Sequence, residues 1–395
     1  MLGIDIVDIN KFQKKIRNNS PFLKIFTNYE LEYARSKDFT KTLAGIYAAK
    51  EAFIKAFNGK LSDIKTKKIT IQHKNNKPYI LYNNIKYDVS ISHDGNYAIA
   101  ICNLKFLIDI DNEMMRLKPR KQDSHKGDYG KILLIGGSSS MSGAIFLTTQ
   151  ASLRSGAGLV YVKCPKSISR ILQIKTTEAI IQAVDCDNFS SDQKVIEQIT
   201  KSIDEVDIIA IGPGMGKAHN INLLLKEIFL KAKDKAIVLD ADALNSISRN
   251  IDILKLHRNL ILTPHPKEFE RLSGLNISYI QKNREKVAKE FAKKYHVTLV
   301  LKGHNSVVTD GKKLYVNKSG TAAMATAGSG DVLVGIISSF LKRYDTFEAV
   351  KLAVYAHGKA GELAELKLDE DSVIASDIID NLAYVLKAMK GAYDE

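Results

Sequence analysis

The sequence predicts a small α+β domain followed by a larger α/β domain whose sheet is mainly parallel. Its 395 residues exceed what one hydrophobic core usually serves, so at least two domains are expected. In the C-terminal two-thirds, continuous apolar runs alternate with helical segments, as in a parallel sheet covered by helices on both faces. Before that, shorter runs include two joined by Asp94-Gly95-Asn96, a hairpin signal. We expect domains at 1–112 and 125–395, joined by a charged linker at 113–124.

The strands and helices of the first domain follow from its hydrophobic periodicity. Helices are expected at 28–37 and 43–57, and strands at 3–9, 68–72, 78–82, 88–93 and 97–102. The first strand contains Asp5 among apolar residues, and a carboxylate there is costly to bury unless it is paired or binds a metal. On the second helix Glu51 and Lys55 lie four residues apart, on one face, and alone they would be a simple ion pair.

The larger domain carries its distinctive residues where expected strands end, at 131–137, 159–164, 207–212, 236–240, 260–263 and 297–302. Ligands of such sheets bind beyond the carboxyl ends of the strands. The residues that follow four of these strands are Gly212–Gly216, Asp240–Asn245, Thr263–Phe269 and Lys302–Ser306. Neither a Walker A sequence nor the dinucleotide fingerprint of dehydrogenases is present.

A run of small residues, Ala325–Asp331, opens directly into the apolar segment that begins at Val332. Gly328 and Gly330 permit a tight turn and a close approach to a ligand. The free N–H groups of the following helix bind anions, phosphate above all. The motif therefore predicts a phosphate site with Asp331 beside it; the alternative is a helix N-cap made by Ser329 or Asp331.

Composition and charge narrow the class of protein. Hydrophobic residues are 45% and charged residues 26% of the chain, as in globular proteins. The net charge is +14, and residues 1–120 hold most of the excess, with 21 Lys and Arg against 12 Asp and Glu. This indicates an acidic partner, or only a lysine-rich composition. The aromatic residues form no stacking platform, so a nucleic-acid partner is not expected.

The cellular location is also constrained by the sequence. No apolar run approaches the length of a membrane span, and the start Met1–Asp5 is unlike a signal peptide, so no membrane association is expected. Three distant cysteines, Cys102, Cys164 and Cys186, lack a CxxC spacing. They fit reduced thiols in a cytoplasmic protein.

Three blocks of the first domain resemble holo-acyl-carrier-protein synthase: Gly3–Val7, Ala49–Ala56 and Val89–His93. The resemblance implies transfer of 4′-phosphopantetheine from coenzyme A to a serine of acyl carrier protein, an acidic partner, and a homotrimer. It implies that Asp5 and Glu51 hold Mg²⁺, which takes one or two carboxylates plus water and phosphate oxygens. Glu51 and Lys55 would be catalytic, and the coenzyme A contacts would be Lys50, Lys55 and His93.

The blocks of residues 125–390 resemble the ADP-dependent NAD(P)H-hydrate dehydratases of the ribokinase-like superfamily. They are Lys126–Gly130, Gly136–Ala144, Gly212–Gly216, Asp240–Asn245, Thr263–Glu268, Lys302-Gly303 and Ala327–Asp331. The resemblance implies that the hydrated nicotinamide nucleotide is bound by Ala144, Gly214 or Gly216, His265 and Asp331. It implies that the adenosine nucleotide is bound by Lys302, Gly303, His304, Asn305, Ser306 and Gly330. In place of the epimerase expected before this domain, the chain carries the synthase-like domain.

The expected chemistry uses ADP as phosphoryl donor. Hydroxide is a poor leaving group, and phosphorylating the ring hydroxyl makes it a good one, so elimination gives NADH or NADPH with AMP and phosphate. Asp331 would accept the hydroxyl proton. A purely structural alternative for His265 is a helix cap or a strand-end hydrogen bond. The alternative function is a small-molecule kinase of the same superfamily, with a non-catalytic trimerisation module in front.

Overall fold

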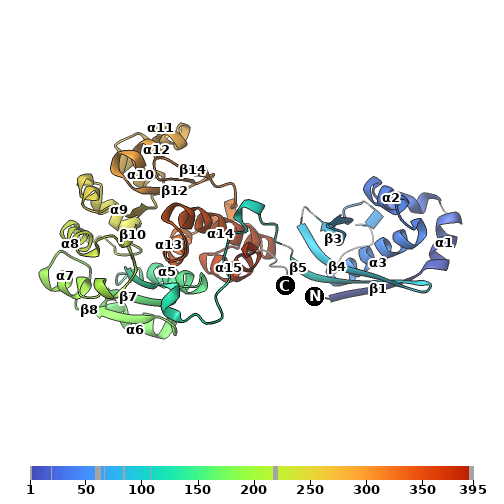
Figure 1. Ribbon diagram of the computed structural model, residues 1–395, viewed down its shortest axis with the longest axis horizontal. Helices are drawn as coiled ribbons and strands as arrows, with labels where there is room; N and C mark the ends of the chain where they lie inside the picture. The colour runs from blue at the N-terminus through green and yellow to red at the C-terminus, as the bar shows by residue number, and fades with distance from the viewer. Residues whose placement is uncertain are drawn as a thin grey trace. The chain divides into compact units, whose positions relative to one another are not determined.

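The computed structural model describes residues 2–18, 20–57, 64, 65, 67–82, 85–106, 108–216 and 221–390. The chain divides into two compact units, Met1–Asp109 and Ile110–Glu395. The division falls close to residue 112, where the sequence predicts the end of the first domain. Each unit has its own sheet and its own core (Figure 1).

The N-terminal unit is an antiparallel sheet with a long helix packed on one face. The strands, in spatial order, are β1 (Leu2–Asp8), β5 (Tyr97–Phe106), β4 (Ile85–Asp94), β3 (Lys77–Tyr82) and β2 (Thr70–Lys74). Helix α3 (Phe39–Phe57) packs against β1 and β5. A Cβ on Gly3 would collide with the backbone of α3 at Ala52, so only glycine permits this close approach.

Two shorter helices complete this unit. Helix α2 (Asn28–Arg35) begins with a capping box between Thr27 and Glu30, which satisfies two backbone N–H groups at its start. Helix α1 (Ile9–Asn18) starts where the sequence predicts the end of a strand. Its one aromatic residue, Phe12, is buried and packs edge-on against Phe26. Ile9, Phe12 and Ile16 follow the helical period, which the expected strand at 3–9 overlooked.

The C-terminal unit is built on a nine-stranded sheet. Its spatial order is β14 (Leu314–Val316), β13 (Val307–Thr309), β12 (Thr298–Leu301), β11 (Leu260–Leu262), β10 (Ala236–Leu239), β9 (Ile208–Ile211), β6 (Lys131–Ile135), β7 (Leu159–Pro165) and β8 (Ile180–Val184). Pairs from β8 to β12 are parallel, and β13 and β14 add antiparallel edges. The expected mainly parallel sheet is confirmed, and the carboxyl ends of β9 to β12 lie together.

Helices cover both faces of this sheet, which explains the continuous apolar runs of its strands. One face packs against α5 (Ser142–Arg154), α13 (Ser329–Phe340) and α14 (Thr346–Lys367), with α15 (Ala375–Met389) packed on α5 and α14. The other face joins the core formed with α7 (Gln193–Thr200), α8 (Asn222–Ala232), α9 (Ala241–Ile247), α10 (Pro266–Ser273) and α12 (Arg284–Tyr295). Two further helices, α6 (Lys166–Lys175) and α11 (Ile277–Lys282), lie beside β8 and α10.

The segment 113–124, predicted as a linker, instead packs onto the C-terminal unit. Met114 and Leu117 are buried, and the Leu117 N–H donates to the carbonyl of Met389. The Lys118 N–H donates to the hydroxyl of Tyr344. Two isolated apolar residues in a charged segment give no periodic signal, so the sequence indicated only a linker. Further along the chain, α11 and α12 are separated at Asn283.

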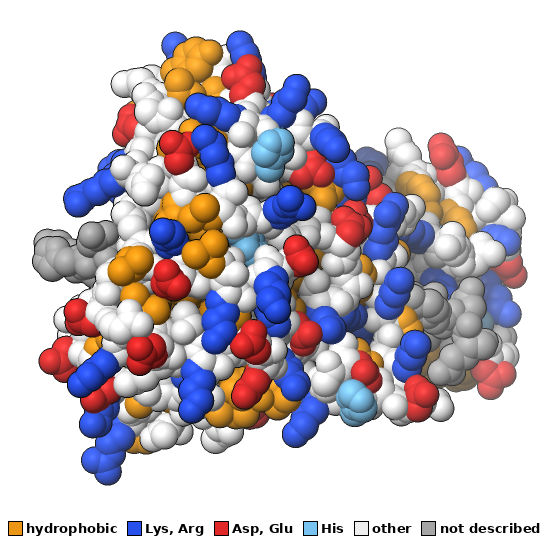
Figure 2. All heavy atoms as spheres, turned by 60° about the vertical axis from the view of Figure 1, so that its left-hand side comes forward, with side chains coloured by type: hydrophobic (Ala, Val, Ile, Leu, Met, Phe, Trp, Pro, Cys, Tyr) orange, Lys and Arg blue, Asp and Glu red, His pale blue; other side chains and the backbone are white. Residues whose placement is uncertain are grey.

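Helix length and the distribution of surface charge bear on a membrane or nucleic-acid partner. Within the described residues, no helix is both long enough and apolar enough to cross a membrane. The face of the C-terminal unit drawn in Figure 2 carries Lys and Arg side chains interspersed with Asp and Glu side chains. No single basic patch dominates this face, in keeping with the smaller positive excess of this part of the sequence.

Candidate functional sites

The glycine-rich motif forms the start of α13, as predicted. Gly328 has φ +92 and directly precedes the helix, with its Cα against the side chain of Leu147, so a larger residue has neither the backbone conformation nor the space. Ser329, Gly330 and Asp331 form the first turn, whose N–H groups have no partner within the helix. The positive end of the helix dipole therefore faces the space in front of Gly330.

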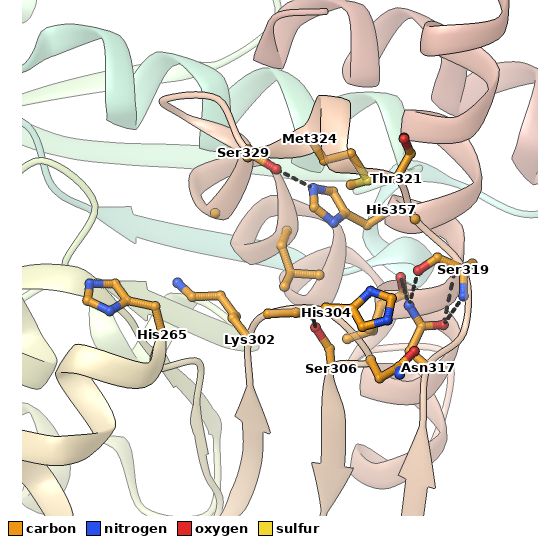
Figure 3. Close-up of a pocket in the computed structure, with 18 of the residues that line it drawn as sticks. His265, Lys302, His304, Ser306, Asn317, Ser319, Thr321, Met324, Ser329 and His357 are labelled. Atoms are coloured by element: carbon orange, nitrogen blue, oxygen red, sulfur yellow. Dashed lines mark hydrogen bonds between the residues drawn. The ribbon is translucent and has the colours of Figure 1, made fainter. Parts of the chain in front are cut away.

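A cavity of about 840 Å³ lies at this helix start and at the carboxyl ends of β10 to β12. It is lined by eight of the residues that are expected to bind substrate or nucleotide: His265, Lys302, Gly303, His304, Asn305, Ser306, Gly330 and Asp331. They come from α10, from the loop after β12 and from α13. Figure 3 shows Lys302 and His265 at one end of the cavity, with Ser306 and Asn317 toward the other.

A buried ion pair fixes Lys302 within the cavity. The Lys302 Nζ lies 2.8 Å from the Oδ1 of Asp240, and that oxygen also accepts the hydroxyl of Thr263 at 2.7 Å. A Cβ on Gly330 would lie 3.2 Å from the same Nζ, so the ammonium sits beside the first turn of α13. Burial acts to lower the pKa of Lys302, but the charges of Asp240, Glu268 and Asp331 outweigh it and raise the pKa. Lys302 is therefore a fixed cation at an anion-binding helix end.

Asp331 is poised to exchange a proton near neutral pH. Burial, and then the negative charge of Asp240, raise the pKa of Asp331 to about 7; Lys302 opposes this and Asp242 adds to it. A general base works best when its pKa lies near the operating pH. A carboxyl at the rim of a phosphate cradle with such a pKa can accept the proton of a hydroxyl that attacks phosphorus.

His265 is the N-cap of α10, so the helix cap that the sequence offered as an alternative describes its local role. Its Nδ1 accepts the N–H groups of Lys267 at 3.2 Å and Glu268 at 3.3 Å, and the Glu268 carboxylate accepts the His265 N–H. Burial, and then the charge of Lys302, lower the pKa of His265. With Nδ1 occupied as an acceptor, the neutral ring carries its proton on Nε2, which lies 3.4 Å from the Oε1 of Glu268.

Several cavity residues were missed by sequence reasoning. Asn317, Ser319, Thr321 and Met324 come from the segment between β14 and α13, and His357 comes from the middle of α14. His357 Nε2 lies 3.3 Å from the Oγ of Ser329, and burial lowers its pKa to about 4 (Figure 3). The run of small and polar residues before the glycine motif was an available signal, whereas His357 lies in a helix that also carries several lysines and glutamates, so the sequence does not mark it.

The remaining substrate residues expected from the sequence form a second cluster outside the cavity lining. A Cβ on Gly214 would lie 2.8 Å from the Cβ of Ala144, so the structure brings these two together. The Gly216 N–H donates to the Oδ2 of Asp242 at 2.8 Å. These contacts join the loop Gly212–Gly216 to Ala144 on α5 and to Asp242 on α9.

In the N-terminal unit, the close packing of β1 on α3 brings Asp5 to Lys55. The Lys55 Nζ lies 2.6 Å from Asp5 Oδ1, and Asp5 Oδ2 is buried without a hydrogen-bond partner among the described residues. Burial, and then a hydrogen bond to Glu51 and the charges of Glu51 and Asp5, raise the pKa of Tyr47. The carboxylates of Glu51 and Asp5 thus both act on the phenol of Tyr47. A cation beside Asp5 Oδ2 would satisfy an oxygen that the protein leaves unpaired.

The position of Lys50 contradicts the expectation that it contacts coenzyme A. Its side chain is fully buried, with Nζ 2.8 Å from Glu30 Oε2 and 3.2 Å from the carbonyl of Ile25, so it cannot contact a phosphate in this arrangement. The reason is its place in the apolar stripe of α3, one turn from Ile46 and Phe53. His93 is partly exposed, and its Nε2 lies 2.9 Å from the carbonyl of Lys41.

The comparisons with known proteins agree with this arrangement. The family model described as NAD(P)H-hydrate dehydratase matches residues 132–383. The chain belongs to this family. A relative named ADP-dependent (S)-NAD(P)H-hydrate dehydratase, from Staphylococcus aureus, is 38% identical over 70% of this chain and 95% of its own length. The ribokinase-like expectation for the fold of this domain is thereby confirmed.

The N-terminal unit matches a different family. The model of the 4′-phosphopantetheinyl transferase superfamily covers residues 1–102. By contrast, a bifunctional NAD(P)H-hydrate repair enzyme from Moorella thermoacetica is 37% identical over 70% of this chain but only 52% of its own length. The chain thus spans about half the length of such relatives, and it joins the dehydratase domain to a transferase-like domain.

Solved structures of the dehydratase family have the same fold as the C-terminal unit. An ADP/ATP-dependent NAD(P)H-hydrate dehydratase from Bacillus subtilis, co-crystallised with ATP and Mg²⁺, is 29% identical with a TM-score of 0.59. It covers 70% of this chain and 95% of its own. A ribokinase-like protein from Enterococcus faecalis has a TM-score of 0.62 at 28% identity, covering 71% of this chain and 95% of its own.

Proposed function

We propose that the C-terminal domain dehydrates hydrated NADH or NADPH, with ADP as phosphoryl donor and AMP and phosphate as products. The observation that carries the proposal is the convergence of Lys302, Gly330 and Asp331 in one cavity. It combines a fixed cation, a free helix N-terminus and a carboxyl whose pKa is raised to about 7. The family membership of residues 132–383 narrows the reaction to this dehydration.

In the proposed reaction the terminal phosphoryl group of ADP passes to the ring hydroxyl. The bond between this phosphorus and the AMP oxygen breaks, a bond to the hydroxyl oxygen forms, and Asp331 takes the hydroxyl proton. The first-turn N–H groups of α13 and Lys302 stabilise the charge on the transferring group. The C–O bond then breaks, phosphate departs, and loss of a ring proton restores the dihydropyridine.

The remaining binding residues are assigned to the hydrated nucleotide or to ADP. His265, Ala144, Gly214 and Gly216 would bind the hydrated nucleotide, whereas Lys302 to Ser306 and Gly330 would bind ADP. Asp331 belongs to both the substrate and the catalytic set. The neutral ring of His265 suits a donor to a polar group of the substrate, because its Nδ1 is already an acceptor within α10.

The N-terminal domain would transfer 4′-phosphopantetheine from coenzyme A to a serine of acyl carrier protein. Asp5 and Glu51 would hold a Mg²⁺ ion, because one buried Asp5 oxygen lacks a hydrogen-bond partner in the part of the chain that the structure describes, and Mg²⁺ keeps water and phosphate in its remaining positions. When bound, the ion would supply charge neutralisation at the pyrophosphate. Lys55 is half-exposed beside Asp5 and would neutralise the same group, and His93 would be a secondary coenzyme A contact.

The transferase assignment also bears on assembly, for which we propose a homotrimer. The face of the sheet opposite α3 exposes apolar side chains from two paired strands, namely Leu2, Ile4, Ile6 and Ile101. A patch of this kind favours association of copies.

The basic excess of residues 1–120 suits acidic acyl carrier protein as partner. Three free cysteines suit the cytoplasm.

The deciding experiment assays the full chain with two substrate pairs. ADP plus hydrated NADH, followed by the appearance of NADH absorbance and AMP, should give turnover. ATP plus candidate vitamin and sugar alcohols should give none. Turnover of an alcohol with no dehydration would establish the kinase alternative instead. In parallel, coenzyme A, apo-acyl carrier protein and Mg²⁺ should give the holo form, and its absence would favour a non-catalytic trimerisation module.

A further inference from the structure

Asp240 lies at the centre of the charged network in the cavity, yet neither the resemblance nor the comparisons give it a role. It follows β10 directly and lines the cavity with its side chain almost fully buried. Its Oδ1 accepts from Lys302 Nζ at 2.8 Å and from Thr263 Oγ1 at 2.7 Å. A buried carboxylate of this kind is stable only with such partners.

The backbone holds Asp240 in one place. Ala241, the next residue, has φ +47, a conformation that costs free energy for a residue with a Cβ. On the other side, Gly212 lies against the Asp240 carbonyl so closely that any side chain there would collide with it. A positive φ at Ala241 and a glycine-only contact at the Asp240 carbonyl fix the backbone from which the Asp240 carboxylate projects.

We propose that Asp240 is a positioning residue for the dehydration: it holds the Lys302 ammonium beside the first turn of α13, where ADP phosphates bind. Without Asp240, Lys302 has a flexible four-carbon stem and other carboxylates, Glu268 and Asp331, to pair with. Pairing with Asp331 would occupy the proposed base. The clamp therefore keeps the cation on the phosphate and the carboxyl free for the hydroxyl. This inference rests on the proposed function of the same site.

The charge of Asp240 also acts on Asp331. Asp240 and Asp242 raise the pKa of Asp331 and Lys302 lowers it, while His265 and His357 face Lys302 from α10 and α14. Neutralising Asp240 removes one carboxylate near Asp331 and frees Lys302 to approach it. Both changes lower the pKa of Asp331, so the acidic limb of the rate profile should move to lower pH.

The test is a double-mutant cycle on the full chain, with ADP binding measured by calorimetry. Asp240→Asn and Lys302→Met should each weaken ADP binding about tenfold, the usual scale for losing a charge-assisted hydrogen bond. If Asp240 acts through Lys302, the double variant should bind as Lys302→Met does, to within about twofold. Asp242→Asn is the matched control: it removes a neighbouring carboxylate that accepts from Gly216, and its effect should add to that of Lys302→Met.

A second readout separates this inference from the proposed function. In Asp240→Asn, the acidic limb of kcat should shift down by about half a pH unit or more. Additive effects of Asp240→Asn and Lys302→Met, or an unshifted limb, would overturn the inference even if wild-type protein turns over the hydrate. Absent wild-type turnover would refute the function, while the binding cycle still tests the clamp. Thr263→Val, which removes one donor to Asp240 without a charge change, covers the case that Asp240→Asn does not fold.

Discussion

The two domains carry proposed phosphate sites built on different physical solutions. In the N-terminal unit Asp5 pairs with Lys55 where β1 packs on α3, and one buried Asp5 oxygen has no hydrogen-bond partner among the described residues. The proposed C-terminal site relies on a helix start, with Lys302 held by Asp240. The first arrangement would need an added cation to be complete, whereas the second has a lysine as its cation. This difference predicts that the two activities respond separately to mutation and to metal removal.

The largest expected effect isolates the N-terminal site. Glu51→Gln should reduce phosphopantetheine transfer at least about 100-fold, because even outer partners of metal sites cost 10–100-fold when removed. Hydrate dehydration by the same protein should remain unchanged. The measurement is both assays on one preparation, in the presence of Mg²⁺. Loss of both activities would show that the two sites are coupled.

A second prediction contrasts two lysines of α3. Lys50→Met should destabilise the N-terminal domain by about 3–5 kcal/mol, because it leaves the Glu30 carboxylate buried and unpaired. Lys55→Met should cost less than Lys50→Met, because the Lys55 ammonium is half-exposed although its partner Asp5 is buried, and it should lower transferase activity. Hydrogen exchange of the Ile71 amide, which donates to Glu30, measures the first effect. Equal stability of the two variants would contradict the structural role given to Lys50.

A third prediction concerns ionisation of Asp331. Its pKa of about 7 lies above its ordinary value, so folding favours the protonated carboxyl, and the cost appears as pH rises from about 4 through 7. Asp331→Asn should therefore be more stable than wild type by about 2 kcal/mol at pH 8, with the gain lost at pH 4. Thermal unfolding at both pH values provides the check. A variant less stable at pH 8 would rule out a destabilised carboxyl.

The smallest effect distinguishes two glycines with positive φ. Gly214→Ala places a methyl group 2.7 Å from the Met141 carbonyl and 2.8 Å from Ala144, whereas Gly274→Ala meets nothing within 4 Å. Gly274→Ala should lose about 1 kcal/mol of stability because of its positive φ, and Gly214→Ala should lose more, because its methyl group also collides with the Met141 carbonyl. Only Gly214→Ala should lower dehydratase kcat/KM, by several-fold. Similar kinetics in both variants would remove Gly214 from the proposed substrate site.

Most of the fold could be predicted, because parallel strands covered on both faces appear in the sequence as continuous apolar runs. The same reasoning failed at the sheet edge, where β8 is only partly buried and β13 and β14 are three residues each. The division after Asp109 lies near the expected end of the first domain at 112, whereas the packing of 113–124, in which Leu117 bonds to the distant Met389, has no signal in the sequence.

The site was predictable where residues follow strands, as Lys302 and His265 do. Side chains from other elements, such as His357 on α14, reach the cavity only through tertiary packing. Lys50 was misjudged although the sequence held the answer: it is four residues after Ile46 and three before Phe53, within the buried stripe of α3. A charged residue in such a stripe indicates a buried ion pair before it indicates a ligand contact.

The most direct test of the central claim is the turnover of hydrated NADH with ADP by Asp331→Asn. If Asp331 is the base beside the helix start, kcat should fall about 10³-fold, within the usual range for removing a general base. ADP affinity should change little, because Lys302 and the first turn of α13 remain. Near-normal turnover in this variant would contradict the proposed mechanism, whatever the wild-type rate.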